Sequence, residues 1–289
     1  MLFEETINKY KDKVETAVGQ LYDKAYQNQM HNTDLLLVLE NGLKKNYDQA
    51  TLERLKMSPY QIGQDFIGFR YNTFYQFINY YRSGVKSKVE FDIEFGDDVK
   101  TKESFLNFYR DFQLLLYMKF WETDLILRRL SNLSSLAQGK PYSWEYSQIV
   151  FNKRRNIIQD EIVKPLRIIC PLFSVLIDEI YSNQIRNAVA HSQYYILYDS
   201  INLTNKDQNP HNKLTRISFD DWEKMFTKVM LLYNFLIKNI NKYQVEYQEN
   251  VRDKQFGLLV SFPEKNVKGS QKTGWLKYDF SHKRWYWNH

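Results

Sequence analysis

Residues 222–240 read WEKMFTKVMLLYNFLIKNI. The apolar side chains of this stretch recur at intervals of three and four residues, which is the period of one face of an α-helix. They are Trp222, Met225, Phe226, Val229, Leu232, Tyr233, Leu236 and Ile240. Ser218, followed three residues later by Asp221, has the spacing of a helix start. The stretch therefore predicts a long amphipathic helix and a mainly α fold built on its apolar face.

The rest of the chain extends this helical pattern. Only 10 Gly and 6 Pro occur in 289 residues, which favours long helices over turn-rich β folds. Helical spacing predicts further helices over residues 3–27, 34–43, 60–82, 101–133, 144–163 and 172–190, with Pro165 and Pro171 as breaks. Strand-like composition predicts short strands over residues 85–95, 194–203, 214–219, 256–262, 275–280 and 284–287. The pair 194–203 and 214–219 predicts a hairpin or a long ordered loop.

The net charge of the chain is unevenly distributed. Residues 1–250 carry 32 basic and 31 acidic side chains, a net of +1, whereas residues 251–289 carry 8 and 3, a net of +5, and the two add up to +6. A hydrophobic content of 43% is too high for a disordered chain. The basic excess therefore belongs to the tail and does not describe the surface as a whole.

Several sequence features indicate the compartment. Cys170 is the single cysteine, which excludes an intramolecular disulfide framework and any multi-cysteine zinc site. The first six residues, MLFEET, turn acidic at once, unlike a secretory signal. The longest mostly apolar stretch, 166–180, is too short and too polar to span a bilayer. We therefore expect a soluble cytoplasmic protein with no membrane partner.

One segment concentrates side chains that can carry chemistry: YSNQIRNAVAHSQYY, residues 181–195. On a helix over 172–190, Asn183, Asn187 and His191 continue an apolar stripe by steps of three or four residues. Burying three polar groups without partners is costly. A face that changes from apolar to polar in this way lies at the surface, is covered by a partner or lines a site.

The pattern Arg186-Asn187-x-x-x-His191 resembles the Arg–polar–x–x–x–His signature of HEPN domains, with a helix before it and an aromatic extended segment after it. These domains are small α-helical bundles, and many are metal-independent RNA endonucleases. The resemblance is clearest over residues 102–240. It implies a mainly α, HEPN-like helical bundle with a small β-hairpin after the motif helix and a short C-terminal β appendage.

The resemblance also divides the chain into three parts. Residues 1–100 are expected to form a mostly helical N-terminal accessory region, residues 101–245 the HEPN-like core, and residues 246–289 a basic, aromatic, β-rich tail. The same Arg-to-His spacing recurs at Arg284 and His289, in the strand-like tail and outside any helical context. The helical context and the small residues inside the first match therefore carry the assignment.

The chemistry of metal-free RNA cleavage explains these residue types. The ribose 2′-OH attacks the adjacent phosphate, which requires a base, an acid for the leaving oxygen and cations for the developing charge. Histidine titrates near neutral pH, and arginine stays charged and fits phosphate oxygens bidentately. His191 is therefore expected to be the acid or base and Arg186 the phosphate clamp. The resemblance adds Asn187 as a positioning residue, and we expect neither a metal nor a cofactor.

A single motif supplies only one histidine. Two copies that face each other across a two-fold axis would supply two histidines and two arginines. The resemblance to HEPN nucleases implies such a pair of facing motifs, so we expect a homodimer. By the same resemblance, the cleaved RNA is expected to carry 2′,3′-cyclic phosphate and 5′-OH ends.

The resemblance also implies a biological setting. Such proteins occur among toxins of toxin–antitoxin systems and in abortive infection, an antiviral defence in which cleavage of cellular RNA arrests growth. An antitoxin, a regulatory subunit or a trigger is then expected to restrain the activity, and residues 1–100 are a candidate place for this control. The alternative is a non-catalytic HEPN-like helical module that dimerises and binds RNA or protein.

The basic tail is a second candidate RNA-binding region. Cations that attract phosphate alternate there with aromatic rings that can stack on unpaired bases. The candidate residues are Lys272, Trp275, Lys277, Lys283, Arg284, Trp285 and Trp287. The alternative is a small β appendage whose aromatic residues form its own core and whose lysines are solvated.

Overall fold

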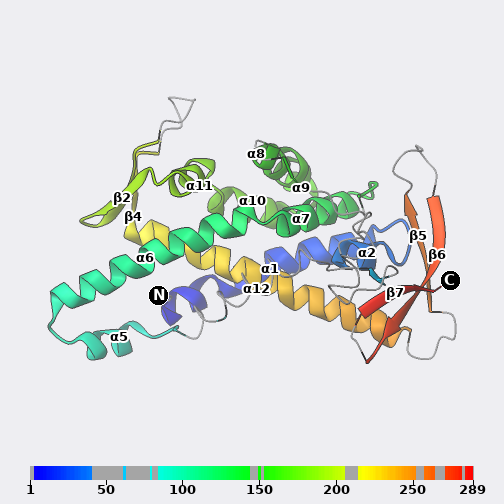
Figure 1. Cartoon of the computed structure of the whole chain (residues 1–289), viewed down its shortest axis with the longest axis horizontal. Helices are drawn as coiled ribbons and strands as arrows, with labels where there is room; N and C mark the ends of the chain where they lie inside the picture. Colours follow the sequence, from blue (N-terminus) through cyan, green and yellow to red (C-terminus); the bar gives the residue numbers. More distant parts are fainter. Residues whose placement is uncertain are drawn as a thin grey trace, which may run out of the picture. The chain divides into compact units, whose positions relative to one another are not determined.

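The computed structural model describes residues 3–40, 61–62, 79, 84–143, 149–150, 153–205, 214–251, 257–263, 271–281 and 284–288 (Figure 1). The fold is mainly helical with two small antiparallel sheets, which confirms the predicted class. None of the helices in these described segments is long and apolar enough to cross a membrane.

The chain forms two compact units, and each is built from three separate segments. Unit 1 comprises residues 1–16, 73–123 and 176–234, and unit 2 comprises residues 17–72, 124–175 and 235–289. The predicted boundaries at residues 100 and 245 stay predictions.

Unit 1 is organised around a cluster of buried aromatic rings. Its helices are the start of α1 (Glu4–Gln27), α5 (Lys88–Phe95), α6 (Val99–Glu122), the end of α10 (Pro171–Ile180), α11 (Asn183–Ala190) and the start of α12 (Phe219–Glu249). Tyr117 of α6 lies edge-on to Trp121 and Trp222, with ring centroids 6.3 and 5.4 Å away. The Nε1 of Trp222 donates to Gln113 Oε1 at 2.8 Å, which pairs its buried polar atom.

The start of α12 confirms the capping prediction. The Ser218 Oγ accepts a hydrogen bond from the Asp221 amide at 3.1 Å, and its hydroxyl donates to Asp221 Oδ2 at 2.8 Å. Asp220 and Asp221 lie in the first turn, where the helix dipole favours negative charge.

The strand predicted over 85–95 is wrong, because most of this segment forms α5. Ser87 and Glu90 make a capping box: the Glu90 amide donates to Ser87 Oγ at 3.1 Å, and the Ser87 amide donates to Glu90 Oε2 at 2.9 Å. Phe91 and Phe95 then pack on Phe105, with centroids 6.0 and 4.8 Å away. The alternating apolar residues suit a strand as well as a helix, and the capping box decides between them.

Two predicted helices are interrupted. The helix expected over 101–133 ends at Glu122 and restarts as α7 (Asp124–Ala137), because Thr123 is extended and its hydroxyl donates to the Lys119 carbonyl at 2.7 Å. In the helix expected over 144–163, residues 149–150 are not helical and α8 (Arg154–Asn156) is; residues 144–148 and 151–152 lie outside the described segments. The cap predicted at Ser143 concerns residues outside the described segments and stays a prediction; the Ser143 amide and carbonyl bind the side chain of Asn132.

Unit 2 contains the end of α1, the start of α10, the end of α12, α2 (Asp34–Glu40), α7, α8, a π-helix η2 (Ile157–Val163) and α9 (Lys164–Ile169). Contrary to the prediction, Pro165 does not interrupt the helical segment formed by η2 and α9. It occupies the first turn of α9, where a missing N–H costs little, and the Ser174 hydroxyl donates to the Val163 carbonyl at 3.0 Å.

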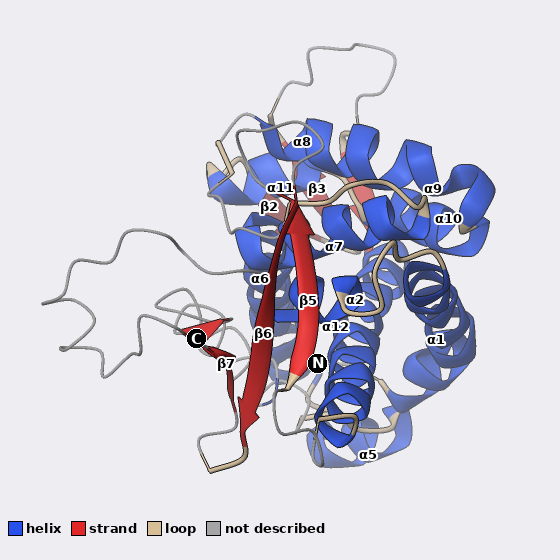
Figure 2. Cartoon of the chain, turned by 90° about the vertical axis from the view of Figure 1, so that its right-hand side faces the viewer, coloured by secondary structure: helices blue, strands red, loops and turns tan. Residues whose placement is uncertain are grey.

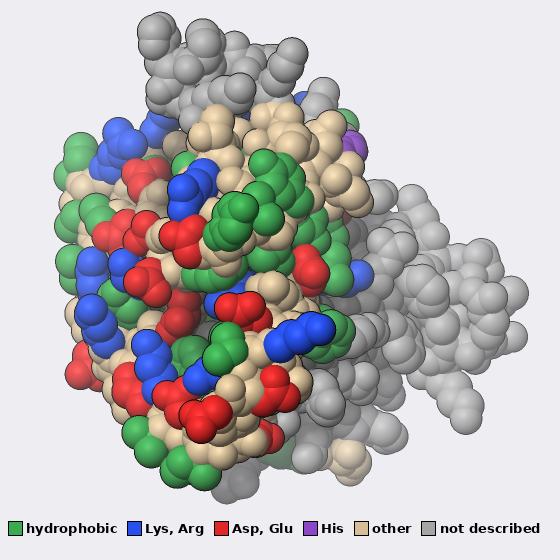
Figure 3. Space-filling model, turned by 90° about the vertical axis from the view of Figure 1, so that its left-hand side faces the viewer, with side chains coloured by type: hydrophobic (Ala, Val, Ile, Leu, Met, Phe, Trp, Pro, Cys, Tyr) green, Lys and Arg blue, Asp and Glu red, His purple; other side chains and the backbone are tan. Residues whose placement is uncertain are grey.

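A three-stranded antiparallel sheet follows α11 in unit 1. The single strand expected over 194–203 divides into β2 (Tyr194–Leu197) and β3 (Ser200–Leu203), and β4 (Arg216–Ser218) pairs with β3. Figure 3 looks onto the side where this sheet lies in Figure 1, and shows hydrophobic side chains gathered among interspersed acidic and basic ones.

The predicted C-terminal β appendage is present in unit 2. It is a sheet of order β1-β7-β6-β5, formed by β1 (Gln61–Ile62), β5 (Leu258–Pro263), β6 (Gln271–Asp279) and β7 (Arg284–Asn288). Figure 2 shows β5, β6 and β7. Gly257 precedes β5 with φ 88°, and a Cβ there would meet the Leu276 carbonyl oxygen at 2.0 Å, so only glycine fits. Of the helix predicted over 60–82, the structure describes only β1 and residue 79.

Candidate active site

The motif lies on a separate short helix. The helix predicted over 172–190 is broken between α10 and α11, and Ser182 caps α11 by accepting from the Ile185 amide at 3.2 Å. The buried hydroxyl of Tyr117 spans the break: it donates to the Ile180 carbonyl at 3.1 Å and accepts from the Ser182 amide at 2.7 Å. Burial raises the pKa of Tyr117 well above its usual range, so the hydroxyl stays neutral.

Tyr117→Phe is expected to lower the free energy of unfolding by about 1–3 kcal/mol, because it leaves the buried Ile180 carbonyl and the partly buried Ser182 amide without their partner. Urea denaturation measures this difference. Tyr198→Phe is the matched control, since its hydroxyl lies on an exposed side chain. Equal stability of the two variants would contradict a bridging role for Tyr117.

Gln184 holds α11 against the strands that follow it. Its Nε2 donates to the Leu214 carbonyl at 2.5 Å, and its Oε1 accepts from the Leu214 amide at 2.8 Å. The Asn205 amide group donates to the Gln184 carbonyl at 2.8 Å. The helix therefore has a fixed position relative to β3 and β4.

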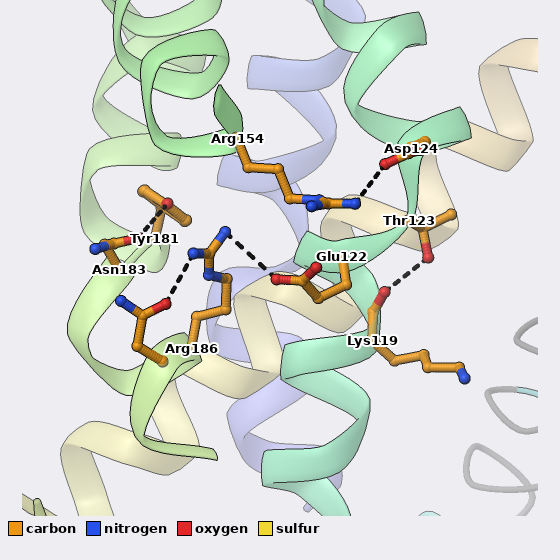
Figure 4. A network of polar contacts seen from close by, with 9 residues as sticks. Lys119, Glu122, Thr123, Asp124, Arg154, Tyr181, Asn183 and Arg186 are labelled. Atoms are coloured by element: carbon orange, nitrogen blue, oxygen red, sulfur yellow. Dashed lines mark hydrogen bonds and ion pairs between the residues drawn. The ribbon is translucent and has the colours of Figure 1, made fainter. Parts of the chain in front are cut away.

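Arg186 points inward and is 6% exposed. Its Nη2 donates to Asn187 Oδ1 at 2.8 Å, and its Nη1 lies 3.4 Å from Glu122 Oε1 (Figure 4). Within the described part of the chain, its Nε and Nη1 have no hydrogen-bond acceptor. The buried guanidinium is therefore charge-balanced but keeps donor capacity.

Asn187 connects Arg186 to the end of the helix. Its side-chain oxygen accepts from Arg186, and its backbone carbonyl accepts from the His191 amide at 3.1 Å. The resemblance assigned it a positioning role, and this geometry suits that role.

His191 ends α11 with an exposed side chain. The next residues form a Schellman motif, in which the Ser192 amide donates to the Val189 carbonyl at 3.2 Å and the Gln193 amide donates to the Ala188 carbonyl at 2.7 Å. Ser192 occupies the left-handed position with φ 54°, where glycine is usual. The backbone of His191 is thus fixed while its imidazole faces solvent.

The structure therefore brings two of the three predicted residues into contact. Arg186 and Asn187 are hydrogen-bonded, whereas the imidazole of His191 makes no hydrogen bond or ion pair to any residue that the structure describes. Glu122 and Tyr117 were not predicted. No local pattern in the sequence reports that a carboxylate and a phenol on α6 contact the motif helix.

The predicted tail residues have different environments in unit 2. Trp275 is exposed and Lys277 is partly buried, whereas Trp285 is 1% exposed and lies 5.1 Å from the Tyr278 ring centroid. The side chains of the other four, Lys272, Lys283, Arg284 and Trp287, lie outside the described residues.

The described residues contain no group of three or more His, Cys, Asp or Glu side chains that could hold a metal ion. Comparisons of the chain with protein-family models, with curated proteins and with solved structures find no match.

Proposed function

We propose that the chain is a metal-independent endoribonuclease of the HEPN type, which cleaves RNA at a composite site formed by two copies. One observation carries the proposal: a short, capped helix holds Arg186 and Asn187 together and ends on a rigid turn that exposes His191. A histidine at such a fixed position, whose imidazole bonds to none of the described residues, is available for proton transfer.

In this mechanism the 2′-oxygen loses its proton to one imidazole and bonds to the adjacent phosphorus. The bond from phosphorus to the 5′-oxygen breaks, and the leaving oxygen takes a proton from the other imidazole of the dimer. The products are a 2′,3′-cyclic phosphate and a 5′-OH. Arg186 would stabilise the charge on the phosphorane oxygens.

The burial of Arg186 adds a condition to this proposal. In the free chain its guanidinium faces Glu122, so a substrate phosphate must compete with that carboxylate. The donors of Arg186 that lack an acceptor supply hydrogen bonds for this exchange.

The proposed setting is cytoplasmic, in abortive infection or in a toxin–antitoxin system, where an antitoxin, a regulatory subunit or a trigger restrains cleavage. A second candidate is a non-catalytic HEPN-like module for dimerisation and RNA or protein binding. The ion pair between buried Arg186 and Glu122 favours it, because such a pair can serve the fold alone.

The test is incubation of RNA with the wild-type protein in EDTA, followed by analysis of the product ends. Cleavage to 2′,3′-cyclic phosphate and 5′-OH ends by a protein that is dimeric by mass supports the nuclease. Binding of RNA without cleavage supports the module, and a monomer at micromolar concentration contradicts the composite site.

A further inference from the structure

The three-stranded sheet of unit 1 carries a row of polar and aromatic side chains on one face. Tyr195 pairs with Asn202 across β2 and β3, and Asn202 pairs with Arg216 across β3 and β4. Directly opposite residues of antiparallel strands point to the same side. Tyr195 is 49% exposed and Arg216 is exposed, whereas Ile201 and Ile217 on the other side are buried. The row of Tyr195, Asn202 and Arg216 is termed the outer sheet face.

Tyr198 lies at the tip of the same sheet, in the two-residue loop between β2 and β3. Its φ is 53°, a conformation that favours glycine at the first position of such loops. Its side chain is 89% exposed, so the ring gains almost nothing from packing. Neither backbone preference nor the core explains a tyrosine here, whereas a ring presented to a ligand does.

The cation of the row is weakly held within the protein. The Nη2 of Arg216 lies 2.5 Å from Asp199 Oδ1, and both side chains are more than half exposed. Exposed ion pairs contribute little because water and salt compete with them. The guanidinium can therefore exchange this carboxylate for a phosphate. Asn202 donates to Ser200 Oγ at 3.3 Å, which keeps its amide in the row.

We propose that the outer sheet face and Tyr198 at the tip of the sheet bind single-stranded RNA, with bases stacked on Tyr195 and Tyr198 and a phosphate held by Arg216. Exposed aromatic rings beside a cation are the combination that holds unpaired nucleotides, because each base offers a flat face and each phosphate a charge. Leu197 lies on the same side of β2 as Tyr195 and is 45% exposed, so a protein partner is the competing occupant that the test has to exclude. This inference rests on the proposed nuclease function, because it assigns the substrate-binding surface of that site.

The position of the row agrees with this role. Tyr195 follows His191 by four residues, and an extended chain spans at most about 3.6 Å per residue. The two Cα atoms are therefore at most about 14 Å apart. RNA on the outer sheet face would lie beside the proposed acid or base.

The test uses the full-length His191→Ala protein, so that the RNA stays intact during the measurement. Anisotropy of a fluorescent oligouridylate gives the affinity. Tyr195→Ala and Tyr198→Gly, each added to this background, are expected to weaken binding about tenfold. Arg216→Gln is expected to weaken it and to reduce its salt dependence.

Tyr198→Gly gives the sharpest readout. It relieves the positive φ, so its melting temperature is expected to rise while its affinity for RNA falls. If the Tyr198 ring instead stabilises the fold, Tyr198→Gly would lower both the melting temperature and the affinity for RNA. Phe108→Ala is the matched control, since this ring of α6 is 67% exposed and lies outside the sheet; its affinity is expected to be unchanged.

The outcomes separate this inference from the nuclease proposal. Unchanged affinity in Tyr195→Ala and Tyr198→Gly overturns the RNA surface even if the wild type cleaves RNA, and so does equal binding of a duplex. Binding that requires both rings, without any cleavage by the wild type, supports the surface and overturns the nuclease. The RNA surface is also overturned if the same substitutions abolish the binding of a protein partner and leave RNA binding unchanged.

Discussion

His191→Ala is expected to lower the rate of RNA cleavage about 10²- to 10⁴-fold, the usual contribution of a general acid or base. The free energy of unfolding is expected to stay within about 0.5 kcal/mol of wild type, because the side chain is exposed and its backbone bonds do not depend on it. Single-turnover cleavage in EDTA measures the first quantity and urea denaturation the second.

Gln193→Ala is the matched control for His191→Ala. Gln193 is also exposed, and only its backbone takes part in the turn after α11. Its activity and stability are expected to match wild type. If the two variants cleave RNA equally fast, His191 is not the acid or base, and the assignment of the site is wrong.

The comparison between sequence and structure shows which features local patterns can predict. The helix from Phe219 and its Ser218 cap were predictable, because a cap and an apolar stripe are both local. The helix in the segment 85–95 was not predictable in this way, because its apolar residues fit the period of a strand as well as that of a helix. The capping box at Ser87 decides for the helix only if it is given more weight than the alternation of apolar residues.

The candidate site likewise has features that the sequence predicts and features that it does not. Arg186, Asn187 and His191 were singled out because their pattern, in a helical context, resembles a known signature. The break before that helix was missed, because the backbone groups it frees are bound by Tyr117 from a distant helix. The burial of Arg186 against Glu122 was missed for the same reason, since a contact between distant segments leaves no local pattern.

Arg186→Ala is expected to destabilise the fold by about 3 kcal/mol. It removes a buried side chain and leaves the Glu122 carboxylate and the Asn187 amide without their cation and donor. Loss of cleavage in this variant would therefore report unfolding as readily as chemistry. A variant that changes the partner of Arg186 separates the two.

Glu122→Gln keeps the shape of the side chain and removes the charge that competes with phosphate. If Arg186 binds the scissile phosphate, this variant is expected to bind RNA about fivefold more tightly, in a cleavage-inactive His191→Ala background, as measured by anisotropy. It is also expected to lose about 1 kcal/mol of stability, because the partly exposed carboxylate is screened by solvent. Affinity and stability would then change in opposite directions.

A purely structural Arg186 gives a different result. Its guanidinium would stay buried whether or not Glu122 is charged, so Glu122→Gln would lower stability and leave RNA affinity unchanged. The matched control is Glu103→Gln, which neutralises an exposed carboxylate on the same helix. It corrects for the general effect of one less negative charge on RNA binding. A gain in affinity for Glu122→Gln no larger than that of Glu103→Gln would therefore contradict the phosphate clamp and favour the non-catalytic module.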